Sequence, residues 1–300
     1  MPAMNIAITL DKNYLQHAAV MLYSLIQHNP EQEMLVYTIC DDKIQDADWQ
    51  KLSEIYKNSK LTVQKVLINV AQFSHFKISD HASYANYYRI QMAQLLPAHV
   101  QKVLYMDVDI VIKQSIKELY DTDVTGYYMA AIEDPDNPLK YTLGLKADEP
   151  YFNSGIMVIN LERWRTTQLN LLLSDFLIKN EAIIQFWDQD AFNVVCKGQW
   201  KPLLPKFNVQ TFMFFMKEDA LTYTLKDVTE AVKNPVILHY TGRSKPWEYM
   251  TFHPRKNVYY EYLLQTPWKD FRPVDKTMAN ALRKYKLMPR FIENIIQKRK

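Results

Sequence analysis

Short apolar runs alternate with segments of helical periodicity along the first third of the chain. The runs at 5–10, 34–40, 61–68 and 102–106 are apolar and rich in β-prone residues, so they predict strands. Between them, apolar residues recur at helical spacing over 18–25, 49–56 and 84–95, and Pro97 closes the last of these segments. This alternation predicts an α/β fold with a Rossmann-like, mainly parallel sheet flanked by helices.

The alternation loosens after residue 125. The segments YYMAAI (127–132) and GIMVINL (155–161) predict further strands, 166–197 is largely helical, and PVILHY (235–240) is the last short apolar run. Beyond Pro267 and Pro273 the spacing predicts two short helices broken at Pro289. The sequence therefore predicts a large α/β domain over 1–265 and a small helical C-terminal extension over 266–300.

Composition and charge limit the class of protein. With 300 residues and 48% hydrophobic content, the chain can bury a substantial core. Residues 276–300 carry eight Lys or Arg against one acid, Glu293, a net of +7; the total of +3 leaves −4 for residues 1–275. Because a nucleic-acid-binding body should be basic along one face, we expect no nucleic-acid partner.

Cysteine usage and the N-terminal segment favour a cytoplasmic protein. Cys40 and Cys196 are far apart and match neither a zinc cluster nor a disulfide framework. Each is most simply a small buried apolar residue. Asp11 interrupts the first apolar run before it reaches the length of a signal sequence or a membrane span.

Two acids stand in the apolar stretch VLYMDVDIVIK (103–113), at Asp107 and Asp109. They follow the predicted strand at 102–106, and residues i and i+2 of a strand share one face. An arbitrary D-x-D is more often a solvated strand end. Two like charges held close are mutually unfavourable, however, and carboxylates suit hard cations such as Mg²⁺ and Mn²⁺. The pair therefore predicts a divalent-metal site at the carboxyl end of a strand.

The chain has no glycine-rich phosphate loop. Its five glycines form neither G-x-G-x-x-G nor G-x-x-x-x-G-K, so a bound nucleotide needs another source of positive charge. LHYTGRSKPW (238–247) offers His239 as a third metal ligand, Gly242 for close backbone approach and Lys245 as a cation. A lone His after a strand is more often structural, and the upstream D-x-D is what favours a ligand here.

Four motifs in order carry a family resemblance: YMDVDIVI, YFNSGIMVINLERWR, FWDQDAFNVV and LHYTGRSKPW. Together they resemble the retaining glycosyltransferases of family 8, which include bacterial lipooligosaccharide galactosyltransferases, glucosyltransferases and glycogenin. The resemblance covers residues 4 to 250. It implies a GT-A fold, a UDP-sugar donor, a saccharide acceptor and Mn²⁺, with Mg²⁺ as the alternative metal.

The resemblance also implies a set of site residues. Asp107, Asp109 and His239 match the family's metal ligands, with Gly242 and Lys245 at the donor's diphosphate. Asp11, Asn13 and Tyr14 resemble the family's uridine contacts, and Arg89, Asn153, Asp188 and Gln189 resemble the groups that hold the donor sugar. Thr9, Val108 and Ser154 are the other expected donor-binding residues. The Tyr14 ring is expected to stack on the base, whereas Lys12 departs from the acid often found at that position.

Ordinary structural roles compete with several of these assignments. Asn153 could be a turn residue, Asp188 a helix N-cap and Arg89 a surface ion-pair partner. Tyr14 could be a hydrophobic staple at the start of its helix.

The expected catalytic residues are Gln189 and Asp188. In the family the Gln189 position faces the sugar, and an amide is a poor nucleophile. We therefore expect front-face substitution rather than double displacement through a covalent intermediate. The sequence does not decide between galactose and glucose, or among a cell-surface glycan, a lipid-linked saccharide and a glycoprotein glycan as acceptor.

Two other classes of function remain as alternatives. A metal-dependent nucleotidyltransferase would release pyrophosphate, and should favour a basic, Gly-rich loop that this sequence lacks. A non-catalytic nucleotide-sugar or glycan-binding scaffold would bind without turnover.

The C-terminal extension has a basic amphipathic pattern. Apolar Met278, Leu282, Tyr285, Ile292, Ile295 and Ile296 recur at helical spacings among Lys and Arg residues. Such a segment can lie in an anionic membrane surface, which would place the protein peripherally at the inner membrane. The competing interpretation is a helical subdomain with a solvated basic face.

Overall fold

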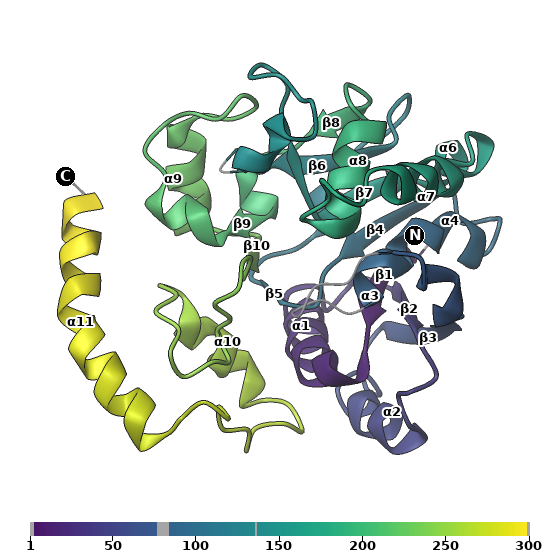
Figure 1. Ribbon diagram of the computed structural model, residues 1–300. Helices are drawn as coiled ribbons and strands as arrows, with labels where there is room; N and C mark the ends of the chain where they lie inside the picture. Colours follow the sequence, from purple (N-terminus) through teal and green to yellow (C-terminus); the bar gives the residue numbers. More distant parts are fainter. Residues whose placement is uncertain (1–2, 77–83, 136, 299–300) are drawn as a thin grey trace.

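The computed structural model describes residues 3–76, 84–135 and 137–298, and it gives the backbone but not the side chains of 138–139 and 289–298. Its main sheet has seven strands in the order β3-β2-β1-β4-β7-β6-β8, and a smaller sheet has the order β5-β10-β9 (Figure 1). The strands are β1 Met4–Leu10, β2 Met34–Cys40, β3 Leu61–Leu67, β4 Lys102–Met106, β5 Ile110–Ile112, β6 Met129–Glu133, β7 Phe152–Asn160, β8 Trp200–Pro202, β9 Val209–Gln210 and β10 Ile237–His239.

Strand direction follows the expected pattern over most of the main sheet. Strands β1 to β4 pair in parallel, β7 runs antiparallel to both β4 and β6, and β8 is parallel to β6. The predicted mainly parallel α/β fold is confirmed. The predicted strand at 235–240 also exists, but it belongs to the smaller sheet.

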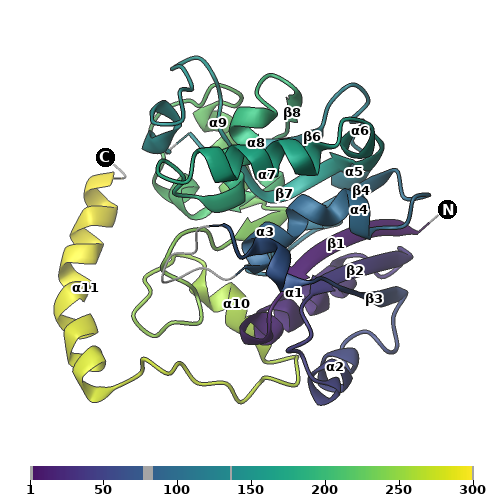
Figure 2. The same ribbon diagram turned by 45° about the vertical axis from the view of Figure 1, so that its right-hand side comes forward.

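Helices cover both faces of the main sheet. The α-helices are α1 Leu15–His28, α2 Asp46–Ser53, α3 Ala85–Tyr88, α4 Met92–Leu95, α5 Lys117–Tyr120, α6 Leu161–Thr166, α7 Leu169–Lys179, α8 Trp187–Val195, α9 Leu225–Lys233, α10 Lys256–Leu263 and α11 Met278–Lys298. Buried residues of α1, α2 and α9 share one apolar core with β5, β9 and β10. Those of α3, α4, α6, α7 and α8 form a second core on the opposite face (Figure 2).

The helical segment at 84–95 is divided. Helices α3 and α4 flank a 3₁₀ turn, Arg89–Gln91. Leu96 adopts an extended conformation directly before Pro97, because the proline ring disfavours helical geometry in the preceding residue. Buried Cys40 and Cys196 are both free thiols, as predicted.

The predicted break at Pro289 is wrong, because α11 runs continuously from Met278 to Lys298. A proline removes one backbone hydrogen bond from a helix. The flanking Leu, Met, Arg and Lys residues are good helix formers, and they continue the helix on both sides. Among the helices that the structure describes, none has the length and apolar character needed to cross a bilayer.

Candidate active site

Strand pairing brings the two acids of the D-x-D next to His239. β4 ends at Met106, and Asp107 to Asp109 form the bend that leads into β5. The Asp107 N–H donates to the carbonyl of Gly155 on β7 at 2.7 Å, and the Tyr240 N–H donates to the Asp109 carbonyl at 3.0 Å. His239 therefore lies beside Asp109, at the junction of the two sheets.

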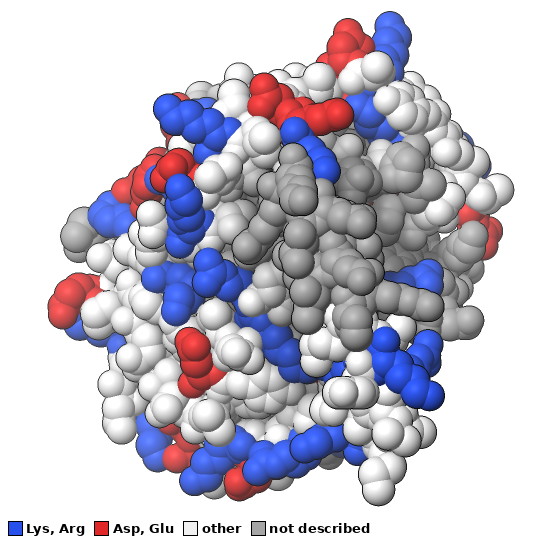
Figure 3. Space-filling view, turned by 90° about the vertical axis from the view of Figure 1, so that its left-hand side faces the viewer, with Lys and Arg blue, Asp and Glu red and all other residues white. Residues whose placement is uncertain are grey.

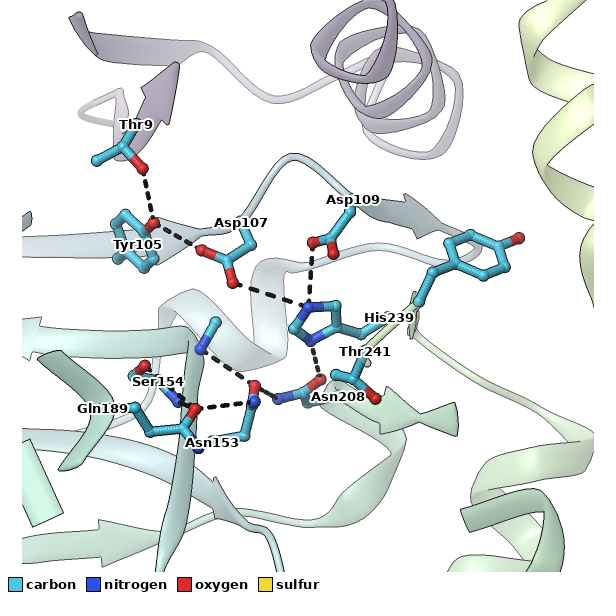
Figure 4. Close-up of polar contacts among 12 residues, drawn as sticks. Thr9, Tyr105, Asp107, Asp109, Asn153, Ser154, Gln189, Asn208, His239 and Thr241 are labelled. Atoms are coloured by element: carbon cyan, nitrogen blue, oxygen red, sulfur yellow. Dashed lines mark hydrogen bonds and ion pairs between the residues drawn. The ribbon is translucent and has the colours of Figure 1, made fainter. Parts of the chain in front are cut away.

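The two acids follow a strand, as predicted, but strand geometry is not what brings their side chains to a common side. The chain leaves the main sheet after Met106 and enters the smaller sheet at Ile110, so the D-x-D occupies the bend between them. The bend nevertheless directs both carboxylates toward one imidazole. His239 Nε2 lies 3.1 Å from Asp109 Oδ1 and 3.8 Å from Asp107 Oδ2 (Figure 4).

Asp107, Asp109 and His239 form a candidate metal site. One ligand atom from each residue lies within 4.8 Å of the others. His239 Nδ1 contacts Asn208 Oδ1 at 2.9 Å on the other side of the ring, and Asn208 Nδ2 donates to Asn153 Oδ1 at 2.9 Å. Since this donation orients the Asn208 amide, Nδ1 of His239 must carry the proton that the Asn208 oxygen accepts.

This hydrogen-bond chain leaves Nε2 of His239 facing two carboxylates. Two negative charges therefore converge on one side of the ring, and a cation bound there would balance them. Two carboxylate oxygens and one oriented imidazole nitrogen are also a suitable ligand set for a divalent metal. The donor set therefore fits the metal expected from the sequence.

Lys245 balances part of the negative charge. Its Nζ donates to Asp109 Oδ2 at 2.6 Å and to the Tyr240 carbonyl at 2.8 Å. Burial alone would raise the pKa of the Asp109 carboxyl, but Lys245 and His239 lower it well below its usual range. Asp109 is therefore an anion, available to a cation at any ordinary pH.

Arg89 joins the metal site to the helix α8. Its guanidinium makes two hydrogen bonds to the fully buried Asp188 carboxylate, and also donates to Asp107 Oδ1 at 3.1 Å and to the Ser154 carbonyl at 3.0 Å. Burial would lower the pKa of Arg89, but the carboxylates of Asp188 and Asp107 more than offset it and raise that pKa. Arg89 is thus a buried cation rather than a surface ion-pair partner.

Gln189 is held by the segment that contains Asn153 and Ser154. Its Oε1 accepts from Asn153 Nδ2 at 3.1 Å and from the Ser154 N–H at 3.0 Å, and its Nε2 donates to the Tyr151 hydroxyl at 3.2 Å. The amide is therefore fixed in orientation. Asn153 is part of this network and is also 8% exposed, so it is not a simple turn residue.

The residues expected around the nucleotide lie at the end of β1. Thr9 Oγ1 is 3.0 Å from the Tyr105 hydroxyl, which donates to Asp107 Oδ1 at 2.7 Å. Asp11 caps a 3₁₀ turn, Lys12–Tyr14, by accepting from the Asn13 N–H. The Tyr14 ring packs edge-on against Trp247, with 6.0 Å between centroids. The D-x-D and the 238–247 motif thus lie near this turn.

The remaining expected residues are placed as follows. Val108 is buried in the bend between the two acids, whereas Gly242 is exposed and has a φ of 85°, a left-handed conformation that favours glycine. Asp188 lies in the first turn of α8, whose N-cap is Phe186, so its alternative role as an N-cap is wrong.

Sequence reasoning missed three residues of the site. Asn208 orients His239 from 31 positions away, and no local motif marks it. Tyr105 orients Asp107 from only two positions away, at the start of the YMDVDIVI motif. Gly155 had a signal, because it stands next to Asn153 and Ser154. A Cβ at Gly155 would lie 2.3 Å from His239 Cε1 and 2.6 Å from Asp107 Oδ2. Only glycine leaves room there for both ligands.

Comparison with known proteins identifies the family of this chain. The family model described as glycosyl transferase family 8 matches residues 5–251. The chain is 30% identical to general stress protein A of Bacillus subtilis, over 88% of this chain and 94% of that protein. It is 28% identical to a lipopolysaccharide 1,2-glucosyltransferase of Escherichia coli K12, over 94% of this chain and 84% of that enzyme.

A solved structure confirms the fold. The galactosyltransferase LgtC, in complex with donor and acceptor sugar analogues, aligns with a TM-score of 0.80 and 24% identity, over 88% of this chain and 96% of LgtC. The fold is therefore the GT-A fold that the sequence predicted. Because the family model spans most of the sequence, this chain is a glycosyltransferase and belongs to glycosyl transferase family 8.

Proposed function

We propose that this enzyme transfers galactose or glucose from a UDP-sugar to a saccharide hydroxyl, with retention of configuration and with Mn²⁺ or Mg²⁺ as cofactor. The observation that carries the proposal is the ligand set of Asp107, Asp109 and His239, whose ring is oriented by Asn208. The activities of two similar proteins, a glucosyltransferase and a galactosyltransferase, support a hexose donor.

The donor would lie between the end of β1 and the start of α8. Tyr14, with Trp247 beside it, offers an aromatic surface to the base, and Lys245 a positive charge to the diphosphate. The proposed donor contacts are Thr9, Asp11, Asn13, Tyr14, Arg89, Asp107, Val108, Asn153, Ser154, Asp188, Gln189, His239, Gly242 and Lys245. The bound metal would act as a Lewis acid on the leaving diphosphate.

The buried carboxylates of α8 support front-face substitution. Both oxygens of Asp188 accept from Arg89. Asp190 Oδ1 accepts from Tyr151, and Asp190 Oδ2 accepts from the N–H groups of Gln185 and Phe186. Carboxylates that are buried and saturated with donors are poor nucleophiles, and the neighbouring Gln189 is a neutral amide.

In the proposed step, the acceptor oxygen bonds to the anomeric carbon on the face from which UDP departs. The anomeric C–O bond to the diphosphate breaks as this bond forms. The hydroxyl proton passes to a departing phosphate oxygen. Lys245 stabilises the growing negative charge, and Gln189 and Asn153 hold the sugar.

The test is release of UDP from a panel of UDP-sugars, with a simple saccharide acceptor, in the presence of Mn²⁺ and of chelator. We expect release from UDP-galactose or UDP-glucose that needs metal and is lost in Asp109→Ala. Asp175→Ala is the matched control, because Asp175 forms an exposed ion pair with Lys179 on α7. Metal-independent release would contradict the cofactor, and pyrophosphate release would favour a nucleotidyltransferase. UDP binding without turnover on any sugar would favour a scaffold.

We also propose that the C-terminal extension, placed at 266–300, contacts an anionic membrane surface. On α11, Met278, Leu282 and Tyr285 are 83%, 61% and 79% exposed. Exposed Arg283 and Lys286 lie on the same helix, and Lys and Arg side chains are prominent on this face of the molecule (Figure 3). Exposed apolar residues next to basic ones suit an anionic bilayer. The side chains of Ile292, Ile295 and Ile296 lie outside the described residues.

Sedimentation with vesicles tests the membrane proposal. We expect binding to vesicles containing phosphatidylglycerol, weaker binding to phosphatidylcholine alone, and loss of binding in Leu282→Ser/Tyr285→Ser. Ala279→Ser, at another exposed position of α11, is the matched control. Equal sedimentation of all three proteins with anionic vesicles would contradict the proposal.

A further inference from the structure

The loop between β10 and α10 carries two side chains that border the active site. Lys245 donates to Asp109, and the Trp247 ring stacks on His17 with 3.5 Å between centroids. Trp247 also packs against Tyr14. Any shift of this loop would therefore displace both the cation beside the metal ligands and the aromatic wall of the proposed nucleotide site.

Two side chains from the C-terminal segment hold the outer part of this loop. The N–H groups of Tyr249 and Met250 donate to the two oxygens of Asp275, at 2.7 and 3.0 Å. Lys284 Nζ donates to the carbonyls of Tyr249 and Thr251, the latter at 3.0 Å. The Asp275 carboxylate thus accepts from backbone N–H groups, and the Lys284 ammonium donates to backbone carbonyls, within residues 249–251. Figures 1 and 2 show α11, which carries Lys284, at the edge of the molecule.

Aromatic contacts and a hydrogen bond from the first turn of α11 reinforce this arrangement. Lys284 Nζ lies 4.8 Å from the ring centroid of Tyr249 and 5.0 Å from that of Phe252. Asn280 Nδ2 donates to the Asp275 carbonyl at 2.8 Å, which ties Asp275 to the first turn of α11. Cation–π contacts of this length add to the hydrogen bonds of the ammonium.

Hydrogen bonds within the loop connect the held stretch to Lys245. The Lys245 N–H donates to Glu248 Oε2 at 3.2 Å, and Ser244 Oγ donates to Thr251 Oγ1 at 2.7 Å. Lys256 of α10 donates to the Glu248 carbonyl from the other side. Lys245 and its neighbour Ser244 are therefore linked to Glu248 and Thr251, which flank or belong to the stretch whose backbone Asp275 and Lys284 bind.

We propose that Asp275 and Lys284 are positioning residues for glycosyl transfer. They hold residues 249–251 of the loop between β10 and α10, so that Lys245 and Trp247 of the same loop face the donor. The inference rests on the proposed function, because it assigns the donor's diphosphate to Lys245. It makes the start of the C-terminal extension part of the active-site architecture, although neither residue contacts the metal ligands.

The test measures kcat and the donor KM of the full-length enzyme with a soluble acceptor, so that no membrane is involved. We expect Lys284→Met and Asp275→Ala each to raise the donor KM by about tenfold, because a tenfold change corresponds to the loss of roughly one charge-assisted hydrogen bond. Lys284→Arg should restore most of the affinity. Lys286→Met, on the exposed side of the same helix, should behave as wild type.

A double-mutant cycle separates positioning from a general loss of stability. In a Lys245→Ala background, Lys284→Met should raise the donor KM by a smaller factor than in the wild type, because part of its effect acts through Lys245. The inference is overturned if Lys284→Met matches Lys286→Met, or if it lowers kcat and the melting temperature while the donor KM stays constant. Absence of UDP release from the wild type would instead overturn the proposed function itself.

Discussion

His239 Nδ1 lies 2.9 Å from Asn208 Oδ1, on the side of the imidazole opposite Asp107 and Asp109. The two residues are 31 positions apart. β9 begins directly after Asn208, β10 ends at His239, and these two strands pair in parallel. Asn208 is fully buried, and its own amide donates to Asn153. This contact sets which nitrogen of His239 is presented to a metal.

Asn208→Ala should therefore weaken metal binding. Loss of an outer partner of a ligating histidine typically lowers metal affinity by about 10- to 100-fold. Titration with Mn²⁺, followed by electron paramagnetic resonance of the free ion, measures this directly. Asn58→Ala, at an exposed position, is the control. An unchanged Mn²⁺ affinity in folded Asn208→Ala would contradict the role of this contact.

Gly155→Ala should push His239 and Asp107 apart without changing the charge of the site. The added methyl group would lie 2.3 Å from His239 Cε1 and 2.6 Å from Asp107 Oδ2, so one or both must move. Because overpacking of this kind costs about 1–3 kcal/mol, we expect Mn²⁺ affinity to fall about tenfold or more. Circular dichroism of the variant should match the wild type. Wild-type metal affinity in a folded Gly155→Ala protein would refute this prediction.

Asp188→Asn should destabilise the protein as well as the site. The substitution leaves Arg89 buried with only Asp107 as a charged partner, and breaking a buried ion pair costs about 3–5 kcal/mol. The free energy of unfolding in urea measures the loss. Asp175→Asn, which breaks an exposed pair with Lys179, should change that free energy by less than about 1 kcal/mol. If the two substitutions lowered the free energy of unfolding equally, the buried pair would contribute no more to stability than the exposed pair.

A 2-fluoro UDP-sugar should leave the protein unmodified. Double displacement would trap a glycosyl adduct on a carboxylate, whereas front-face substitution forms no covalent intermediate. Mass spectrometry of the intact protein, followed by peptide mapping, provides the measurement. An adduct on Asp188 or Asp190 would require abandoning the front-face mechanism.

Stability should fall as the pH falls from about 6.5 to about 4, in part because of His253. Burial, together with the nearby Lys245 and Arg255, lowers the pKa of His253 from 6.5 to about 4. Its Nδ1 accepts from the Arg255 N–H, and its Nε2 is buried with no hydrogen-bond partner among the residues that the structure describes. The folded protein thus keeps His253 neutral while the unfolded chain binds a proton, at a cost of up to about 1.4 kcal/mol per pH unit.

Unfolding in urea at several pH values tests this contribution. His253→Asn should flatten the dependence between pH 6.5 and 4, because asparagine can accept from Arg255 but does not titrate. His99→Asn, which changes an exposed histidine, should leave the slope as in the wild type. The same slope in all three proteins would show that His253 does not contribute.

Periodicity was sufficient for the alternation of strands and helices in the first third of the chain, because a period of 2 or 3.6 is a local property. The seven predicted strands all occur in the structure, whereas the short strands β5, β8 and β9 were missed. The D-x-D with His239 could be selected as a candidate metal site from residue chemistry alone. The bend at Asp107–Asp109 could not be predicted in the same way. It depends on the chain passing from one sheet to another, and Ile110–Ile112 would fit either sheet by composition.

The orientation of the site came mainly from contacts between distant residues. Asn208 contacts His239 across 31 positions, and Arg89 contacts Asp107 and Asp188 across 18 and 99 positions. Such contacts have no local signature. The same holds for Asp275 and Lys284, which looked like ordinary polar residues of a basic tail. The residue types establish which chemistry is available, and the packing of separate elements establishes which atoms face one another.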